Sequence, residues 1–215
     1  MKPMQVHILR AKTGQIDGWA RFDGAGVRLD GGSGPGPAAG AGMTTVLIVP
    51  GSQVALIPLQ LPARLKGEKA RIAAQFAVED QLGQGIGGAH LALSLVRENQ
   101  HALVVDPVVL DGWLEQARAQ DITPDAVFPV HALLPSTGDM TCDVGDEQVI
   151  RIGSECVAID LEMDERAIAA LGLASTTITR VDLDQQTEWA RDRALADPSG
   201  GLLQGRYGAG TASFA

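Results

Sequence analysis

The sequence has few cysteines and few basic residues, and both shortages narrow the classes of protein to which it can belong. Its 215 residues contain two cysteines, Cys142 and Cys156, at no spacing typical of a metal site or a disulfide framework. Two thiols in a chain of this length indicate a reducing compartment. The 17 Lys and Arg residues face 26 Asp and Glu residues, and the net charge is -9 without a basic cluster. This balance argues against nucleic acid as a partner, because a protein binds it by neutralising its phosphates with basic side chains. It also argues against direct binding to an anionic lipid surface.

Long apolar runs are also missing. The longest are Val46–Pro50 and Leu103–Leu110, and Asp106 interrupts the second. A membrane-spanning helix needs about 20 apolar residues, and the first residues lead into a strand-like run in place of a signal peptide. The chain as given is therefore predicted to be soluble, with an apolar fraction of 45% that suits a globular core.

Motifs that bind nucleotide phosphates are missing as well. No Gly-Lys-Ser/Thr sequence occurs, so the chain has no Walker A loop. Residues 83–88 match the letters of a G-x-G-x-x-G motif, but they follow a predicted helix and precede a predicted strand, the reverse of the order that binds a pyrophosphate. The four histidines show no ligand spacing. A nucleophile pair of His131 with Cys142 or Cys156 stays open, although both cysteines fall in predicted strands, where a buried thiol is usually inert.

The first third of the chain is predicted to be rich in strands. Apolar and β-branched residues indicate short strands at Val6–Ile8, Trp19–Phe22 and Gly26–Leu29. Thr44–Val49 is apolar on consecutive positions, which is typical of a strand buried on both faces. Between them, Asp30–Gly42 is rich in Gly, Pro and Ala and has no periodicity, and this composition predicts a flexible loop.

Two helices are predicted before residue 120. Gly67–Leu82 places Ile72 and Phe76 on one stripe, which we expect to face the core. Pro107–Ala119 begins at an Asp-Pro pair, in which the acid caps the helix and the proline occupies its first position. Trp113 lies on the apolar face of this second helix and is predicted to be a core anchor.

The pattern of elements then starts again. Strands are predicted at 139–143, 148–152 and 156–161, and a short helix, a strand at 176–181 and a helix at 184–195 follow. Three strands followed by alternating helix and strand, present twice, is the pattern of a duplicated ribonuclease-H-like lobe.

The duplication predicts an α/β fold with the following domain limits. The first lobe spans residues 1–135 and carries a small inserted subdomain at residues 50–97. The second lobe spans residues 136–200, and residues 201–215 form a tail.

Three segments carry signatures that extend over most of the chain. Residues 201–207 (GLLQGRY) resemble a terminal N-L-L-Q-G-x-[FY] signature, and residues 73–82 (AAQFAVEDQL) are similar to an A-L-P-[YF]-x-L-E-[ED]-Q-L helix. Residues 102–107 with Trp113 and Leu114 are close to V-A-V-V-x-[RK]-x-x-[ML]-x-x-W-L, with an Asp-Pro pair where a more basic turn is usual. In this order and spacing, the segments resemble the cytoplasmic part of the protein L family of the type II secretion system (GspL).

This resemblance implies a degenerate actin-like ATPase fold, in which two ribonuclease-H-like lobes carry a small inserted subdomain. It implies a non-enzymatic scaffold of the inner-membrane platform, which recruits the secretion ATPase (GspE) by binding that enzyme's N-terminal domain. Membrane and periplasmic parts outside this chain pair with GspM in the family, and a homodimer is left open. The tail is expected to lead toward a membrane helix of a single-pass protein, with this part at the cytoplasmic face of the bacterial inner membrane.

An active actin-like ATPase needs two Asp-x-Gly hairpins, whose backbone amides cradle phosphates and whose carboxylates hold the metal. The first hairpin, Ile8–Gly14, has no acid on its first strand, and Asp143–Gly145 is followed by Asp146 and Glu147. Two carboxylates there would repel a polyanion by about 1–4 kcal/mol per close pair. We therefore expect no catalytic residue, no cofactor and no metal. An active actin-like ATPase or a sugar-kinase relative is the alternative.

Acidic residues gather in the predicted second lobe, and their plain interpretation is a solvated face. Because the chain is net negative, we also expect a docking surface for a basic partner there. Its candidate contacts are Glu162, Glu165 and Asp184.

Overall fold

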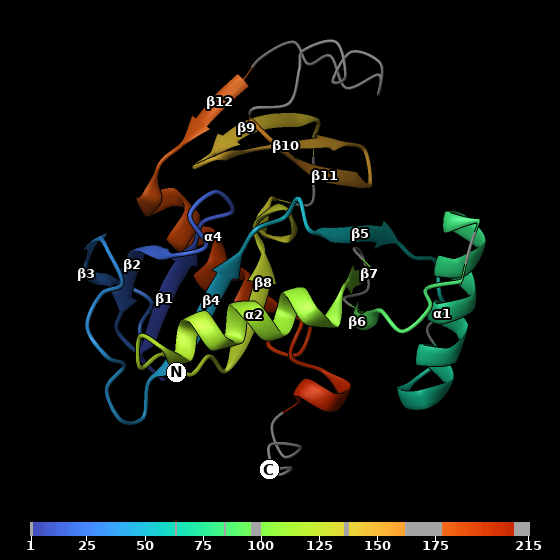
Figure 1. The fold of residues 1–215 in the computed structure, drawn as a ribbon, viewed down its shortest axis with the longest axis horizontal. Helices are drawn as coiled ribbons and strands as arrows, with labels where there is room; N and C mark the ends of the chain where they lie inside the picture. The colour runs from blue at the N-terminus through green and yellow to red at the C-terminus, as the bar shows by residue number, and fades with distance from the viewer. Residues whose placement is uncertain are drawn as a thin grey trace.

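The computed structural model describes residues 2–62, 64–83, 85–95, 100–135, 138–161 and 178–208. Within these residues the strands form three sheets, with five, four and three strands. The five-stranded and four-stranded sheets lie on either side of the helix α4 (Leu183–Ala196), and the small sheet lies beside them (Figure 1). The candidate site Glu162 and the candidate site Glu165 both fall outside the described residues.

The largest sheet has the strand order β3-β2-β1-β4-β8. β1 is antiparallel to β2 and parallel to β4, and β4 is parallel to β8. The strands are β1 (Met4–Leu9), β2 (Ile16–Phe22), β3 (Arg28–Ser33), β4 (Thr44–Val49) and β8 (Ala126–Pro129).

The four-stranded sheet repeats the same scheme in the order β11-β10-β9-β12. Its first three strands form an antiparallel meander, and its last strand is parallel to the first strand of that meander. The strands are β9 (Met140–Val144), β10 (Glu147–Ile152), β11 (Glu155–Asp160) and β12 (Ile178–Val181). The predicted duplication of a ribonuclease-H-like lobe is therefore confirmed by the sheet topology.

The small sheet has the order β5-β7-β6 and consists of β5 (Val54–Pro58), β6 (His90–Ser94) and β7 (His101–Val105). It lies between β4 and β8 in the chain, so the prediction of an inserted unit agrees with its place in the sequence. Its strand β7 lies beyond residue 97, and the domain limits remain a prediction.

The helix α1 (Gly67–Leu82) spans the predicted residues but presents a different face to the small sheet. Its buried residues are Ala70, Ala74 and Val78, whereas Ile72 is 48% exposed and Phe76 is 69% exposed. The predicted core stripe was therefore wrong. Alanines on the inner face let the helix backbone approach the sheet closely, and the two large side chains lie on the outer face.

Two further helices cover opposite faces of the largest sheet (Figure 1). On β4, Leu47 and Val49 join the core under α2 (Pro107–Arg118), and Val46 and Ile48 join the core under α4. The prediction that β4 is buried on both faces is confirmed. The core on the α4 side continues into the four-stranded sheet, so the two lobes share one apolar interior.

Both helices are capped at their N-termini by an acidic residue that directly precedes them. Asp106 accepts a hydrogen bond from the backbone N–H of Val108 at 2.8 Å, as predicted from the Asp-Pro start of α2. Asp182 accepts one from Gln185 N–H at 2.8 Å at the start of α4. Each acid satisfies a backbone donor that the first turn leaves unpaired.

The segment predicted as a loop is partly wrong, because residues 28–33 form β3. The following turn then folds over β1. Its carbonyl oxygens at Pro35 and Pro37 lie 3.0 Å from His7 Nδ1 and 2.7 Å from Gln5 Nε2. Both side chains are fully buried polar groups on β1. They need acceptors, and a glycine-rich chain without bulky side chains can bring its backbone close enough to supply them.

Trp113→Ala is expected to lower the free energy of unfolding by about 3–5 kcal/mol, because it removes a side chain that is only 7% exposed from the core under α2. Urea denaturation measures the change. The control Val108→Ala, on the same helix but at a side chain that is 77% exposed, should stay within about 0.5 kcal/mol of the unmodified protein. A Trp113→Ala protein of undiminished stability would contradict the core role.

Candidate functional site

The turns that correspond to the two phosphate hairpins touch each other. One is the turn between β1 and β2, and the other is the turn between β9 and β10. The backbone N–H of Lys12 in the first turn donates to the carboxylate of Asp146 in the second at 2.6 Å. The two lobes therefore meet through their own hairpins at this point.

Arg10 occupies the space against the second hairpin. Its Nε pairs with Asp17 Oδ1 at 2.8 Å, and its Nη1 donates to Gln186 Oε1 at 3.2 Å. A Cβ atom added at Gly145, where φ is 68°, would lie 2.0 Å from Arg10 Nη1. Glycine suits the left-handed backbone of this turn, and a side chain here would have to displace the end of Arg10.

Glu147 occupies the backbone donors that follow β4. It is 3% exposed, and its carboxylate accepts hydrogen bonds from Gly51 N–H at 3.0 Å and Ser52 N–H at 2.7 Å. Burial raises the pKa of Glu147, and the hydrogen bonds from Ser52 and Gly51 oppose that change. Paired backbone amides are the groups with which a loop holds an anion. Here a carboxylate of the chain itself fills that position.

The described residues contain no group of three or more His, Cys, Asp and Glu side chains that could hold a metal ion. Asp143, the acid expected to face a metal in the second hairpin, accepts a hydrogen bond from Gln148 Nε2 at 3.0 Å. One oxygen of Asp143 is therefore engaged within the same sheet.

The nucleophile pair left open by the sequence does not form. Cys156 Sγ lies 3.4 Å from the backbone oxygen of His131. Burial raises the pKa of the Cys156 thiol to about 11 and also raises the pKa of Cys142. Burial, with smaller contributions from His101 and Arg151, lowers the pKa of His131 to about 3. A ring of such low pKa is a poor base for so weak an acid, and both cysteines pack in the core under α4.

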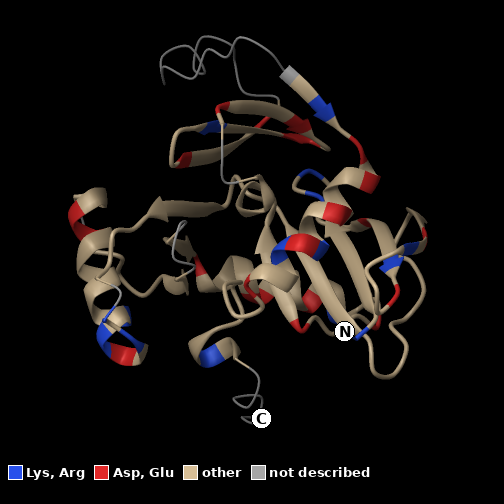
Figure 2. Cartoon of the chain, turned by 180° about the vertical axis from the view of Figure 1, so that it is seen from behind, with Lys and Arg blue, Asp and Glu red and all other residues tan. Residues whose placement is uncertain are grey.

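Asp184, the predicted contact site that the structure describes, lies in the first turn of α4. It forms an ion pair with Arg28 of β3, and 63% of its side chain remains exposed. The first two charged residues of α4 are acidic, and Arg191, Asp192 and Arg193 follow near its end; Figure 2 shows both colours on this helix. The carboxylate is therefore accessible and is partly neutralised within the chain.

The segment 201–207 packs between the small sheet and α2, a placement that sequence reasoning missed when it treated the segment as the start of a tail. Leu202 is fully buried, and its N–H donates to Val127 O at 2.8 Å. His90 of β6 donates through Nε2 to Leu202 O at 2.7 Å, and burial lowers the pKa of this ring. A Cβ at Gly201 would lie 2.6 Å from Val127 O, so the close approach requires glycine.

The side chain of Gln204 pairs with the free edge of β6. Its Oε1 accepts from Leu93 N–H at 3.0 Å, and its Nε2 donates to Leu93 O at 2.8 Å. One amide side chain thus makes the two hydrogen bonds that a neighbouring strand would make. Tyr207 then donates to Asp111 of α2 at 2.8 Å. The segment therefore connects the small sheet to α2 of the first lobe. The terminal sequence signature marked these residues but did not predict that they connect the two.

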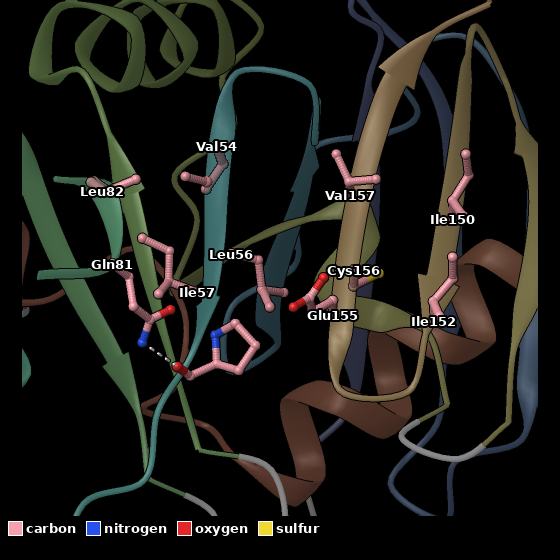
Figure 3. Close-up of a pocket in the computed structure, with 12 residues that line it drawn as sticks. Val54, Leu56, Ile57, Gln81, Leu82, Ile150, Ile152, Glu155, Cys156 and Val157 are labelled. Carbon is pink, nitrogen blue, oxygen red and sulfur yellow. Dashed lines mark hydrogen bonds between the residues drawn. The ribbon is translucent and has the colours of Figure 1, made fainter. Parts of the chain in front are cut away.

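A groove of about 340 Å³ lies between β5 and β11 (Figure 3). Aliphatic side chains such as Leu56, Ile152 and Val157 line it, with the carboxylate of Glu155 at its margin. In the described sheets, β5 pairs only with β7 and β11 only with β10, and no described backbone hydrogen bond joins β5 to β11. Free strand edges beside apolar side chains suit contact with protein, not with phosphate.

Two ribonuclease-H-like lobes that meet through their paired hairpins, with a small sheet inserted in the first lobe, define an actin-like ATPase fold. The family model for "Type II secretion system (T2SS), protein L" matches residues 38–187. The chain therefore belongs to the protein L family of the type II secretion system.

One solved structure shares the fold of this chain. The cytoplasmic domain of EpsL, an inner-membrane component of the type II secretion system of Vibrio cholerae, is similar with a TM-score of 0.62 and 16% identity, over 95% of this chain and 99% of that one. A Bacteroides thetaiotaomicron protein with an actin-like ATPase fold has a TM-score of 0.46 and 11% identity, over 94% and 89% of the two chains. No curated protein matches the sequence significantly. Within the described ranges, no helix is long and apolar enough to cross a membrane.

Gln204→Glu is expected to lower the free energy of unfolding by about 2–3 kcal/mol, because the isosteric carboxylate loses both donors and faces the carbonyl of Leu93. Urea denaturation measures the loss. Gln60→Glu, at an exposed glutamine, is the matched control and should be nearly neutral. Equal stability of the two variants would show that the amide pairing contributes nothing.

Proposed function

We propose that this chain is a non-enzymatic scaffold of the type II secretion inner-membrane platform, which recruits the secretion ATPase (GspE) through that enzyme's N-terminal domain. The observation that carries the proposal is that side chains of the chain itself occupy the second phosphate hairpin and the backbone amides that follow β4. Arg10 fills the space at Gly145, and Glu147 takes the amides of Gly51 and Ser52. Membership of the protein L family supports the same role.

The electrostatics at the hairpins oppose nucleotide binding. A phosphate entering between the lobes would have to displace the carboxylate of Glu147 from two backbone donors. It would also approach Asp146, which already accepts from Lys12 N–H. Hydrogen bonds to an ionised acceptor are each worth about 1.5–3 kcal/mol, so the internal contacts compete directly with the ligand. An active ATPase would need both acids to move away.

The proposed recruitment surface is the acidic side of the second lobe. Glu162, Glu165 and Asp184 are its proposed contacts with basic residues of the ATPase domain. The exposed carboxylate of Asp184 supports this assignment. Charges at the rim of an interface act mainly on the association rate. The apolar groove between β5 and β11 is the second surface that suits a protein partner.

The proposal places the domain at the cytoplasmic face of the bacterial inner membrane. Membrane and periplasmic parts of the protein, beyond the residues described, would pair with GspM. The resemblance of the three sequence signatures and the likeness to the EpsL cytoplasmic domain support this arrangement. Self-association is left to measurement.

Calorimetric titration with Mg-ATP is expected to give no binding at millimolar nucleotide, because the phosphate positions are filled from within. Thermal unfolding with and without Mg-ATP should give the same midpoint, since a ligand that binds the folded state must raise it. Micromolar binding would overturn the scaffold assignment in favour of an active ATPase.

The triple variant Glu162→Lys, Glu165→Lys, Asp184→Lys is expected to slow association with the isolated N-terminal domain of the cognate secretion ATPase by about 10-fold or more at low salt, and by much less at high salt. Biolayer interferometry measures the rate. The fold should survive, because the exposed Asp184–Arg28 pair contributes about 0–1 kcal/mol.

The matched control reverses three exposed acids outside the second lobe, Glu68, Asp80 and Glu115. It changes the net charge equally and should retain most of the association rate. If both triple variants associate like the unmodified protein, the contact is not on the acidic lobe. If the unmodified domain binds no ATPase segment at all, recruitment itself is wrong.

A further inference from the structure

Four basic side chains lie close together where the small sheet, the four-stranded sheet and α4 pack against one another. This junction cluster consists of His101 on β7, His131 on the turn η1 (Val130–Leu133), Arg151 on β10 and Arg193 on α4. His131 is fully buried, His101 is 1% exposed and Arg151 is 4% exposed. The small sheet, the four-stranded sheet, the turn η1 and the helix α4 each contribute one member, so the cluster lies where these four elements pack together.

One arginine of the cluster has a carboxylate partner. Arg193 Nη2 lies 3.6 Å from Asp197 Oδ2 and donates to Ser94 Oγ at 2.9 Å. Ser94 in turn donates to Asp197 at 2.6 Å. The same Nη2 lies 3.3 Å from His101 Nε2. This half of the cluster forms a connected network with one negative charge.

The other arginine, Arg151, has no carboxylate partner among the described residues. Arg151 lies opposite Cys156 in the β10–β11 register, and Cys156 contacts the backbone of His131, so these groups share one buried face of the sheet. In the described ranges, no carboxylate pairs with the Arg151 guanidinium. The nearby acid on β10, Glu147, is committed to the amides of residues 51 and 52. Burying a guanidinium without a carboxylate partner is unfavourable, so a counter-charge is expected.

The unpaired atoms of the cluster are all nitrogens. Nδ1 and Nε2 of His131, Nε of Arg151 and Nε of Arg193 are sealed from solvent and have no hydrogen-bond partner among the described residues. An arginine nitrogen can only donate, and a neutral imidazole donates through one of its two nitrogens. The cluster is therefore rich in donors and poor in acceptors, the chemistry of an anion site.

We propose that the junction cluster binds one small monovalent anion of the halide class, chloride in the cell, against Arg151 and His131. Arg193 is paired with Asp197, whereas Arg151 has no carboxylate partner in the described ranges, so one monovalent anion against Arg151 would supply its missing counter-charge. Space at the site is limited, because a Cβ at Gly51 would already lie 2.4 Å from His131 Nδ1. A multivalent oxyanion would overcompensate the charge and needs more room.

The test compares thermal unfolding of the 215-residue chain in sodium chloride and in sodium gluconate at equal concentrations. Both salts screen the acidic surface equally, so a difference reports on the anion. We expect the midpoint to rise with chloride alone, by roughly 5–10 °C at a concentration 100 times the Kd. Equal midpoints in the two salts would overturn the proposal and mean that water fills the cluster.

Arg151→Met should abolish the difference between the salts. Arg180→Met, at an exposed arginine on β12 of the same sheet, should keep it. If Arg151→Met fails to fold, crystals of the unmodified chain in sodium bromide decide the question by anomalous scattering. A bromide within hydrogen-bond distance of Arg151 is expected, and bromide at surface sites alone would overturn the proposal, as would a chloride response that Arg151→Met retains.

Discussion

The two lobes are joined at their centre by the carboxylate of Glu147, which accepts hydrogen bonds from the backbone N–H groups of Gly51 and Ser52. A buried carboxylate is unfavourable unless donors surround it, and two amides at the end of a strand have no other buried acceptor. The carboxylate and the two N–H groups therefore satisfy each other. The contact joins the start of β10 to the residues that follow β4, and the neighbouring residue Asp146 accepts from Lys12 N–H in the other hairpin. The two lobes are therefore held together by hydrogen bonds between their own residues.

Other contacts between distant elements are of the same kind. In each, a polar side chain forms a hydrogen bond or an ion pair with a group that is far away in the sequence. Gln204 completes the edge of β6, and Leu202 fills the core beneath it. Arg193 and Asp197 extend from α4 into the small sheet through Ser94. This chain thus has the architecture of an actin-like ATPase fold, and its own polar side chains join the two hairpins and the elements around them.

Much of the fold was predictable, because repeated strand–helix order and apolar spacing are local properties of a sequence. The duplicated lobes, the burial of β4 on both faces and the Asp106 cap of α2 all followed from such patterns. The inner face of α1 did not. Its large residues Ile72 and Phe76 were predicted to face the core, but the sheet contacts the small side chains of the other face. The space between a helix and its neighbour decides which face fits, and the sequence of the helix does not contain that information.

The candidate site divides in the same way. The sequence alone determined that Asp146 and Glu147 follow the second hairpin and that the first lacks an acid, because both are facts of composition at a recognisable turn. Only the tertiary structure decided what those acids do. Glu147 bonds to residues 95 and 96 positions away, and Gln204 to one 111 positions away. Periodicity encodes which residues are buried, but a hydrogen bond between distant segments exists only once the sheets have packed and placed donor against acceptor.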